Sequence, residues 1–175
     1  MPNTIDGGGY VSRTAIIARK FAVALRQPAF VWLWLVPAWL LIGMSSAMIA
    51  LLPFRRIAPW LGANLGATAH RPAATPEQAA RARLIGRAVS IAAGYAPFRS
   101  NCLPQAMAAK ALCALWRVPC AVILGVERER PEGDLRAHAW TSCGDATPTG
   151  GACSFATHVP LSCFVPAYVA AQLQR

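Results

Sequence analysis

Residues 99–112 read Arg99-Ser-Asn-Cys-Leu-Pro-Gln-Ala-Met-Ala-Ala-Lys-Ala-Leu112. The apolar positions of this stretch and its continuation fall on one helix face: Leu103, Met107, Ala111 and Leu115. Pro104 suits the first turn of a helix, where the backbone N–H groups have no carbonyl partner. The spacing therefore predicts a helix over 101–116 with Cys102 at its start.

Strand signals follow this helix. Residues 120–126 are apolar and β-branched, as in a buried strand. The polar stretch 127–134 is predicted as a turn, 135–143 as the returning strand, and Gly144-Asp145 as the next turn. With a further strand near the C-terminus, the fold class is α+β, a helix packed on a small antiparallel sheet.

A second helix is predicted before this unit. Thr75 is its N-cap, Pro76 stands at the first helical position, and Gly94 and Pro97 end it. Upstream, the composition predicts a disordered start over 1–14, an apolar helical region over 15–62 with a short amphipathic helix at its beginning, and a linker over 63–74. The catalytic domain is then 75–175.

The apolar region contains no charged residue from Gln27 to Phe54. That length permits a membrane-spanning helix, and Arg26, Arg55 and Arg56 flank it. The alternative is a buried helical hairpin or a kinked core helix, because Pro37 and Gly43 weaken a straight span. A cytoplasmic protein, associated with a membrane or a partner through 27–54, is expected.

Composition narrows the function classes. The formal net charge of the 175 residues is +10, which favours anionic partners, but the basic residues form no run and do not interleave with aromatics. We therefore expect no nucleic-acid partner. None of the six cysteines stands in a metal-binding or redox spacing, so no metal or cofactor is predicted.

Cys102 and His138 are the candidate catalytic pair. The dipole and free N–H groups of a helix start favour a thiolate, and Cys102 has that position. His138 lies in the predicted strand segment Ala137-His-Ala-Trp140, where alternation puts its side chain on the face of Trp140, toward a packed helix. His70 and His158 are interpreted as structural.

The segments around both residues resemble a known family. Arg99-Ser-Asn-Cys-Leu-Pro-Gln-Ala, Arg117-Val-Pro-Cys-Ala-Val-Ile-Leu-Gly-Val and Ala137-His-Ala-Trp are similar to the transglutaminase-like cysteine peptidases of lasso-peptide biosynthesis, the B proteins. The resemblance implies a papain/transglutaminase-like core that removes the leader from a ribosomal precursor, so that a separate ATP-dependent cyclase can close the macrolactam. It implies Cys102 as nucleophile and His138 as base. The backbone N–H of Cys102, at a helix start, is expected to be one donor to the oxyanion, with Asn101 or Gln105 as helpers.

The sequence departs from the family pattern in two ways. Family members carry an Asp about a dozen residues beyond the His, but Thr149, Gly150 and Gly151 stand there. The acids nearby are Asp134 and Asp145, and Asp145, in the turn after the His138 strand, is the better candidate to orient His138. A backbone carbonyl or a Thr hydroxyl are the alternatives. Nothing before Thr75 resembles the strands of a leader-recognition domain, so a separate recognition protein is implied.

Two other functions fit the same residues. A Cys/His site can transfer the acyl group to an amine, as transglutaminases do, instead of to water. A non-catalytic, membrane-associated adaptor of a peptide maturation complex would need Cys102 and His138 only as structural residues.

Overall fold

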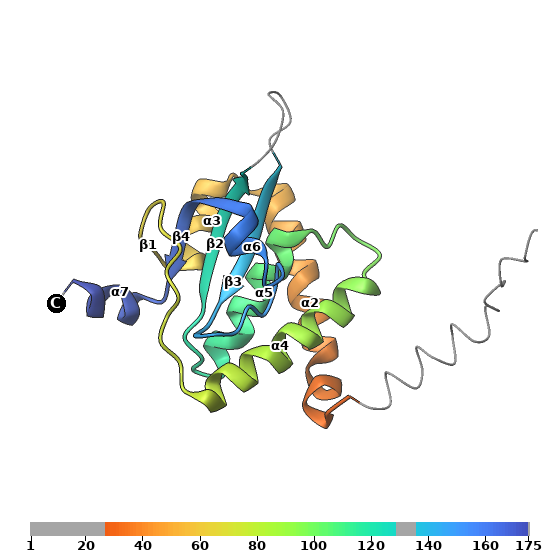
Figure 1. The fold of residues 1–175 in the computed structure, drawn as a ribbon. Helices are drawn as coiled ribbons and strands as arrows, with labels where there is room; N and C mark the ends of the chain where they lie inside the picture. The colour runs from red at the N-terminus through yellow and green to blue at the C-terminus, as the bar shows by residue number, and fades with distance from the viewer. Residues whose placement is uncertain (1–26, 129–135, 175) are drawn as a thin grey trace, which may run out of the picture.

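A computed structural model of the chain describes residues 27–128 and 136–174. Its helices are α2 (Ala29–Leu51), α3 (Phe54–Leu61), α4 (Pro76–Gly94), α5 (Cys102–Leu115), α6 (Ser154–Thr157) and α7 (Ala167–Leu173). Its strands are β1 (Ala63–Asn64), β2 (Ala121–Glu127), β3 (Ala137–Ser142) and β4 (His158–Val165) (Figure 1). The predicted disordered start, the short amphipathic helix and most of the turn before β3 lie outside the described residues.

The two helices predicted around the site are confirmed. α5 begins at Cys102, with Asn101 as its N-cap in an extended conformation. α4 begins at Pro76, and Thr75 forms a capping box with Gln78: each side chain bonds the backbone N–H of the other residue. The capping box fixes where α4 begins, whereas the start of α5 has no side-chain cap.

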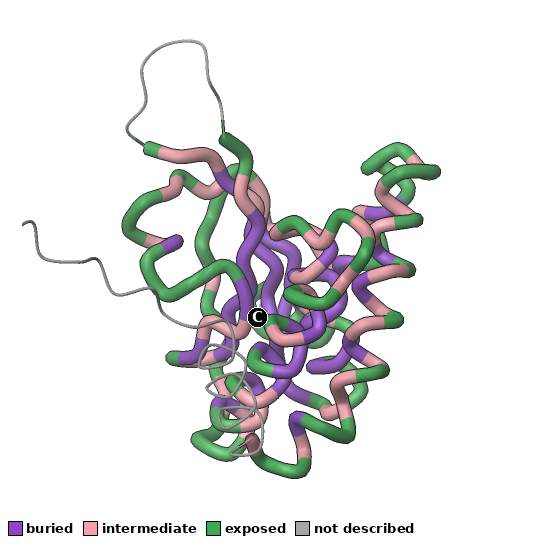
Figure 2. The backbone as a smooth tube through the Cα atoms, turned by 90° about the vertical axis from the view of Figure 1, so that its right-hand side faces the viewer, coloured by how far each residue is buried: buried purple, intermediate pink, exposed green. Residues whose placement is uncertain are grey.

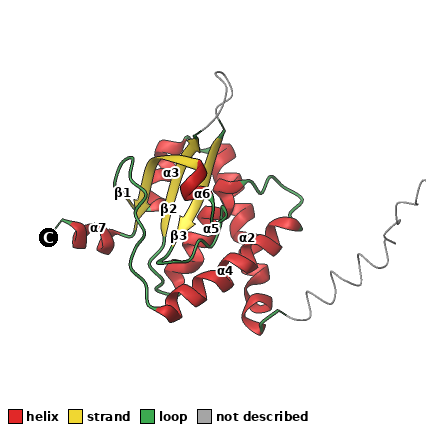
Figure 3. Ribbon diagram, in the orientation of Figure 1, coloured by secondary structure: helices red, strands yellow, loops and turns green. Residues whose placement is uncertain are grey.

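The four strands form one antiparallel sheet in the order β1-β4-β2-β3. β2 and β3 pair with Gly125 opposite His138 and Ile123 opposite Trp140. The predicted α+β class is therefore confirmed, with helices on both sides of a small sheet (Figure 3).

The segment predicted as a linker is partly built into this sheet. Ala63 and Asn64 pair with the end of β4, and the Leu65 N–H continues the contact by donating to the Cys163 carbonyl. Farther on, the Gly144 N–H donates to the Pro72 carbonyl. Backbone groups that find partners in the sheet hold the chain in place, so residues 63–72 are ordered rather than a free connection.

Apolar side chains fill both faces of the sheet. On one face, Ala139 packs with Ala106 and Met107 of α5. On the other, Trp140 is fully buried with Val169 of α7 and is contacted by Phe155 of α6. Figure 2 shows buried residues gathered along the sheet and exposed ones on the outer sides of the helices.

α2 is one continuous helix with Pro37 inside it. Its buried residues include Val31, Ala38 and Ile42, which share a core cluster with α4 and α5. Long, exposed apolar side chains cover the opposite side: Trp32, Leu33, Val36, Leu40, Met44 and Leu51. By length and composition this helix could also cross a membrane, yet one face of it is part of the protein core.

Candidate active site

Cys102 lines a pocket of about 340 Å³. The Cys102 side chain is half-buried at the first residue of α5. Strand residues line the pocket together with Phe54 and Leu103: Leu124, Gly125, Ala137, His138, Ala139, Leu161 and Ser162. A helix start that opens into a largely apolar pocket can present a thiolate to a bound peptide.

The other cysteines are less suited to react. Cys113, Cys120, Cys143 and Cys163 are buried. Burial raises the pKa of Cys143 to about 12 and also raises that of Cys163, so both are held as thiols. Cys153 is exposed, but it does not line the pocket of Cys102.

His138 is held by a backbone carbonyl. Its Nε2 lies 3.0 Å from the oxygen of Gly150. A carbonyl oxygen can only accept, so Nε2 carries the proton, and Nδ1 of the neutral ring is left as the basic nitrogen. This hydrogen bond therefore leaves one ring nitrogen, Nδ1, free to accept a proton.

Gly150 is a conformational requirement of this arrangement. Its φ is +88°, and a Cβ at this position would lie 2.3 Å from Cβ of Trp140. Only glycine adopts this conformation so close to the strand. The Ser154 hydroxyl donates to the same Gly150 carbonyl at 2.6 Å, which fixes the acceptor that orients His138.

His158, which was predicted to be structural, lies beside His138. The two imidazole centroids are 4.7 Å apart, and the Trp140 ring stacks on His138 and lies tilted beside His158. His158 Nδ1 is 2.8 Å from the Thr157 hydroxyl. Strict alternation from Cys163 would place His158 on the other face of the sheet. The register shift of β4 opposite Leu124 and Gly125 reverses this, so His158 lies on the same face as His138.

The prediction that α5 packs on the face of His138 is wrong. His138 does share a face with Trp140, but α5 packs on the face of Ala139. A helix can approach closely over the small Ala139, whereas the buried indole of Trp140 needs the space on the other face. Cys102 and His138 therefore reach their common pocket from opposite faces, where edge strand β3 begins.

The Cys102 Sγ and the His138 imidazole, which both belong to the described part of the chain, make no direct hydrogen bond. Such catalytic hydrogen bonds are often long before substrate binds and shorten in the complex. Both residues line the same pocket, and the Gly150 carbonyl holds the imidazole ring of His138.

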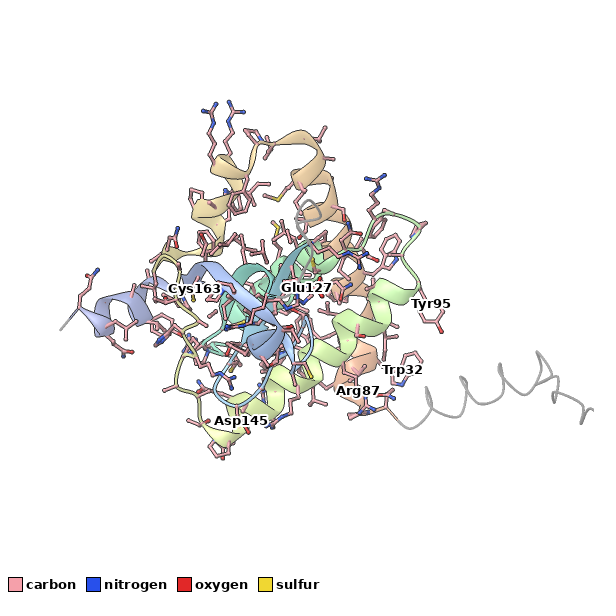
Figure 4. The ribbon with its side chains drawn as sticks, turned by 45° about the horizontal axis from the view of Figure 1, so that its top comes forward. Trp32, Arg87, Tyr95, Glu127, Asp145 and Cys163 are labelled. Atoms are coloured by element: carbon pink, nitrogen blue, oxygen red, sulfur yellow. The ribbon has the colours of Figure 1, made fainter. Side chains whose placement is uncertain are left out.

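Asp145 is placed away from this pocket. It follows the far end of β3, where its Oδ2 forms a 2.6 Å ion pair with Arg83 of α4. Figure 4 shows Asp145 beside α4, away from Glu127, which ends β2 next to the start of β3. The Gly150 carbonyl therefore replaces Asp145 as the candidate group that orients His138.

Replacing Asp145 with Asn is expected to leave turnover unchanged. The Arg83–Asp145 pair is mostly exposed, so its loss should cost less than about 1 kcal/mol of unfolding free energy. Peptide cleavage rates and urea denaturation of Asp145→Asn and the parent chain would measure both effects. A tenfold loss of turnover, about 1.4 kcal/mol of activation free energy, would return Asp145 to the site.

Gln105 and Asn101 have different surroundings. The Gln105 amide donates to the Ser100 carbonyl at 2.6 Å and so holds the turn that leads into Cys102. The exposed Asn101 side chain makes no capping hydrogen bond to the helix. Neither residue lines the pocket of Cys102. No cluster that could hold a metal ion occurs within residues 27–128 and 136–174.

The core of the protein is an α+β arrangement in which a helix that begins at Cys102 packs on an antiparallel sheet, with His138 on the edge strand. The chain matches the transglutaminase-like superfamily over residues 48–173 and belongs to that superfamily. The match includes every element from α3 to α7 and the end of α2. No curated protein and no solved structure shows significant similarity to the chain.

Proposed function

We propose that the protein is a cysteine peptidase that removes the leader from a ribosomally made lasso-peptide precursor. The observation that carries the proposal is the pocket shared by Cys102 and His138, with the imidazole oriented by Gly150. Superfamily membership supports a cysteine-dependent enzyme. The resemblance of the segments around both residues to the B proteins supports the precursor as substrate.

In the proposed reaction, Nδ1 of His138 accepts the proton of Cys102, and Sγ attacks the scissile carbonyl carbon. The C–N bond breaks, the leaving amine takes the proton from Nδ1–H, and a thioester remains on Cys102. Water then gives a proton to Nδ1 and attacks the thioester, which releases the carboxylic acid and restores the thiol. The net reaction is hydrolysis of one amide bond.

The oxyanion of the tetrahedral intermediate needs hydrogen-bond donors. The backbone N–H of Cys102 stands at the first residue of α5 and has no acceptor within the helix. Because the helix start also carries a partial positive charge, this N–H is the donor that we assign to the oxyanion. Gln105 would support the oxyanion site only indirectly, because its amide holds the turn at Ser100 that leads into Cys102.

The test is to incubate the full chain with a candidate precursor and its leader-recognition protein, with and without the cyclase, and to identify the products by mass. Free leader carrying a new carboxylate supports the peptidase. If added hydroxylamine is incorporated in place of water even at low concentration, the acyl-transferase alternative gains support. Intact precursor under all conditions, with no labelling of Cys102 by a thiol reagent, would instead favour the non-catalytic adaptor.

We also propose that α2 lies in the plane of an anionic membrane surface. The exposed residues along this helix are all apolar, while Ser45 is buried and Ser46 donates to the Arg99 carbonyl. An apolar hollow of about 200 Å³ lies between α2 and α4 beside Tyr95. Exposed Arg55 and Arg56 follow the helix and suit anionic headgroups.

Charged substitutions on the exposed face of α2 are expected to lower vesicle binding by at least about tenfold, since each removes apolar contact with lipid. The measurement is flotation of the full chain with phosphatidylcholine/phosphatidylglycerol vesicles, comparing the double variant Leu40→Glu/Met44→Glu with Leu173→Glu. Leu173 is an equally exposed apolar residue on α7. Parent protein that stays unbound, or equal losses in both variants, would rule out this docking face.

A further inference from the structure

A second pocket, of about 920 Å³, lies away from Cys102. Its walls come from the segment that leads into α4, from the C-terminal half of α5 and from α7. We call it the basic pocket, because the basic residues of its lining are His70, Arg71, Lys110 and Arg117. None of its lining residues that the structure describes is acidic.

Lys110 is the central cation of the basic pocket. Its Nζ donates to the Cys120 carbonyl at 2.6 Å, and the side chain is half-buried. Burial lowers the pKa of the Lys110 ammonium, and no carboxylate among the described lining residues offsets its charge. A cation removed from water is costly without a counter-ion, so an anionic group entering the pocket would relieve this cost.

The rest of the pocket suits a peptide better than a small inorganic anion. Trp60, Tyr168 and Leu173 present exposed apolar surface in its lining. Arg71 is fixed with its guanidinium carbon 3.8 Å from the centroid of the Phe155 ring, which leaves a positioned cation at the margin. Apolar walls with a few positioned cations suit a peptide segment in which apolar side chains stand next to a carboxylate.

We propose that the basic pocket binds an acidic segment of the peptide substrate, away from the scissile bond. This inference rests on the proposed peptidase function. α5 carries both sites, because Cys102 begins the helix and Lys110 stands two turns later. Eight residues of helix span about 12 Å, a distance that an extended peptide needs about four residues to cover. The acidic side chain must therefore stand at least about four residues from the cleaved bond.

The first test measures binding alone, with the Cys102→Ala chain and fluorescein-labelled hexaglutamate. Lys110→Gln, which keeps a donor for the Cys120 carbonyl, and Arg71→Gln are each expected to weaken binding about tenfold. The matched control is Arg55→Gln, which removes the same charge from exposed Arg55 on α3. Equal weakening by Arg55→Gln, or no difference between hexaglutamate and hexaglutamine, would overturn the basic pocket as a specific site.

The second test measures cleavage of the precursor. Lys110→Gln should raise KM about tenfold with kcat nearly unchanged, because a remote contact binds the ground and transition states equally. Glu→Gln changes in the precursor at least about four residues from the scissile bond should raise KM similarly. An unchanged KM overturns the proposal, whereas absence of any cleavage contradicts the peptidase function and leaves the binding result to stand by itself.

Discussion

Cys102→Ala should lower precursor cleavage by at least about a thousandfold, because no thioester can form without the sulfur. His138→Ala should cause a loss of the same order, and the double variant should be little worse than either single one. The two residues act in one proton transfer, so their effects do not add. Single-turnover rates measured by product mass would give the three values.

The matched control is Cys153→Ala. Cys153 is the exposed cysteine of the chain and does not line the pocket. It should react with a thiol reagent without loss of cleavage, whereas alkylation of Cys102 should abolish it. Cleavage that survives Cys102→Ala, or that is lost with Cys153→Ala, would refute the assignment of the nucleophile.

Gly150→Ala should lower both stability and turnover, the latter by at least about a hundredfold. The new Cβ would lie 2.3 Å from Trp140 Cβ, so the loop must move and take with it the carbonyl that orients His138. The left-handed conformation alone costs about 1–2 kcal/mol. Urea denaturation and cleavage rates of the folded variant would separate the two losses.

Gly151 provides the control for this variant. Its φ of +86° is close to that of Gly150, but an added Cβ would meet nothing within 4 Å. Gly151→Ala should therefore lower the free energy of unfolding, because of the conformational cost, but leave turnover unchanged. Equal losses of turnover in both variants would mean that the Gly150 carbonyl is not the orienting group.

Local patterns were sufficient for the elements that carry the site. The stripe through Leu103 and Met107 predicted α5, and Thr75-Pro76 predicted the beginning of α4. These signals depend on residues within about one helical turn of each other, so they can be recognised in the sequence itself. For the same reason, the strands on either side of the turn after Glu127 were located within a residue or two.

Contacts between distant segments were beyond these patterns. A backbone carbonyl has no side-chain signature, so the role of Gly150 appears only once its loop is seen folded against Trp140. Likewise, the pairing of β4 with β2 brings His158 to His138. The packing face of α5 depends on the difference in size between Ala139 and Trp140, which alternation ignores.

The carbonyl that orients His138 has a consequence for acidity. A carboxylate in that position would gain a proton as pH falls, and the hydrogen bond to the imidazole would be lost with its charge. The amide oxygen of Gly150 gains no proton between pH 3 and pH 10, so the ring keeps the same orientation across that range. The same dipole stabilises an imidazolium less than a full negative charge would.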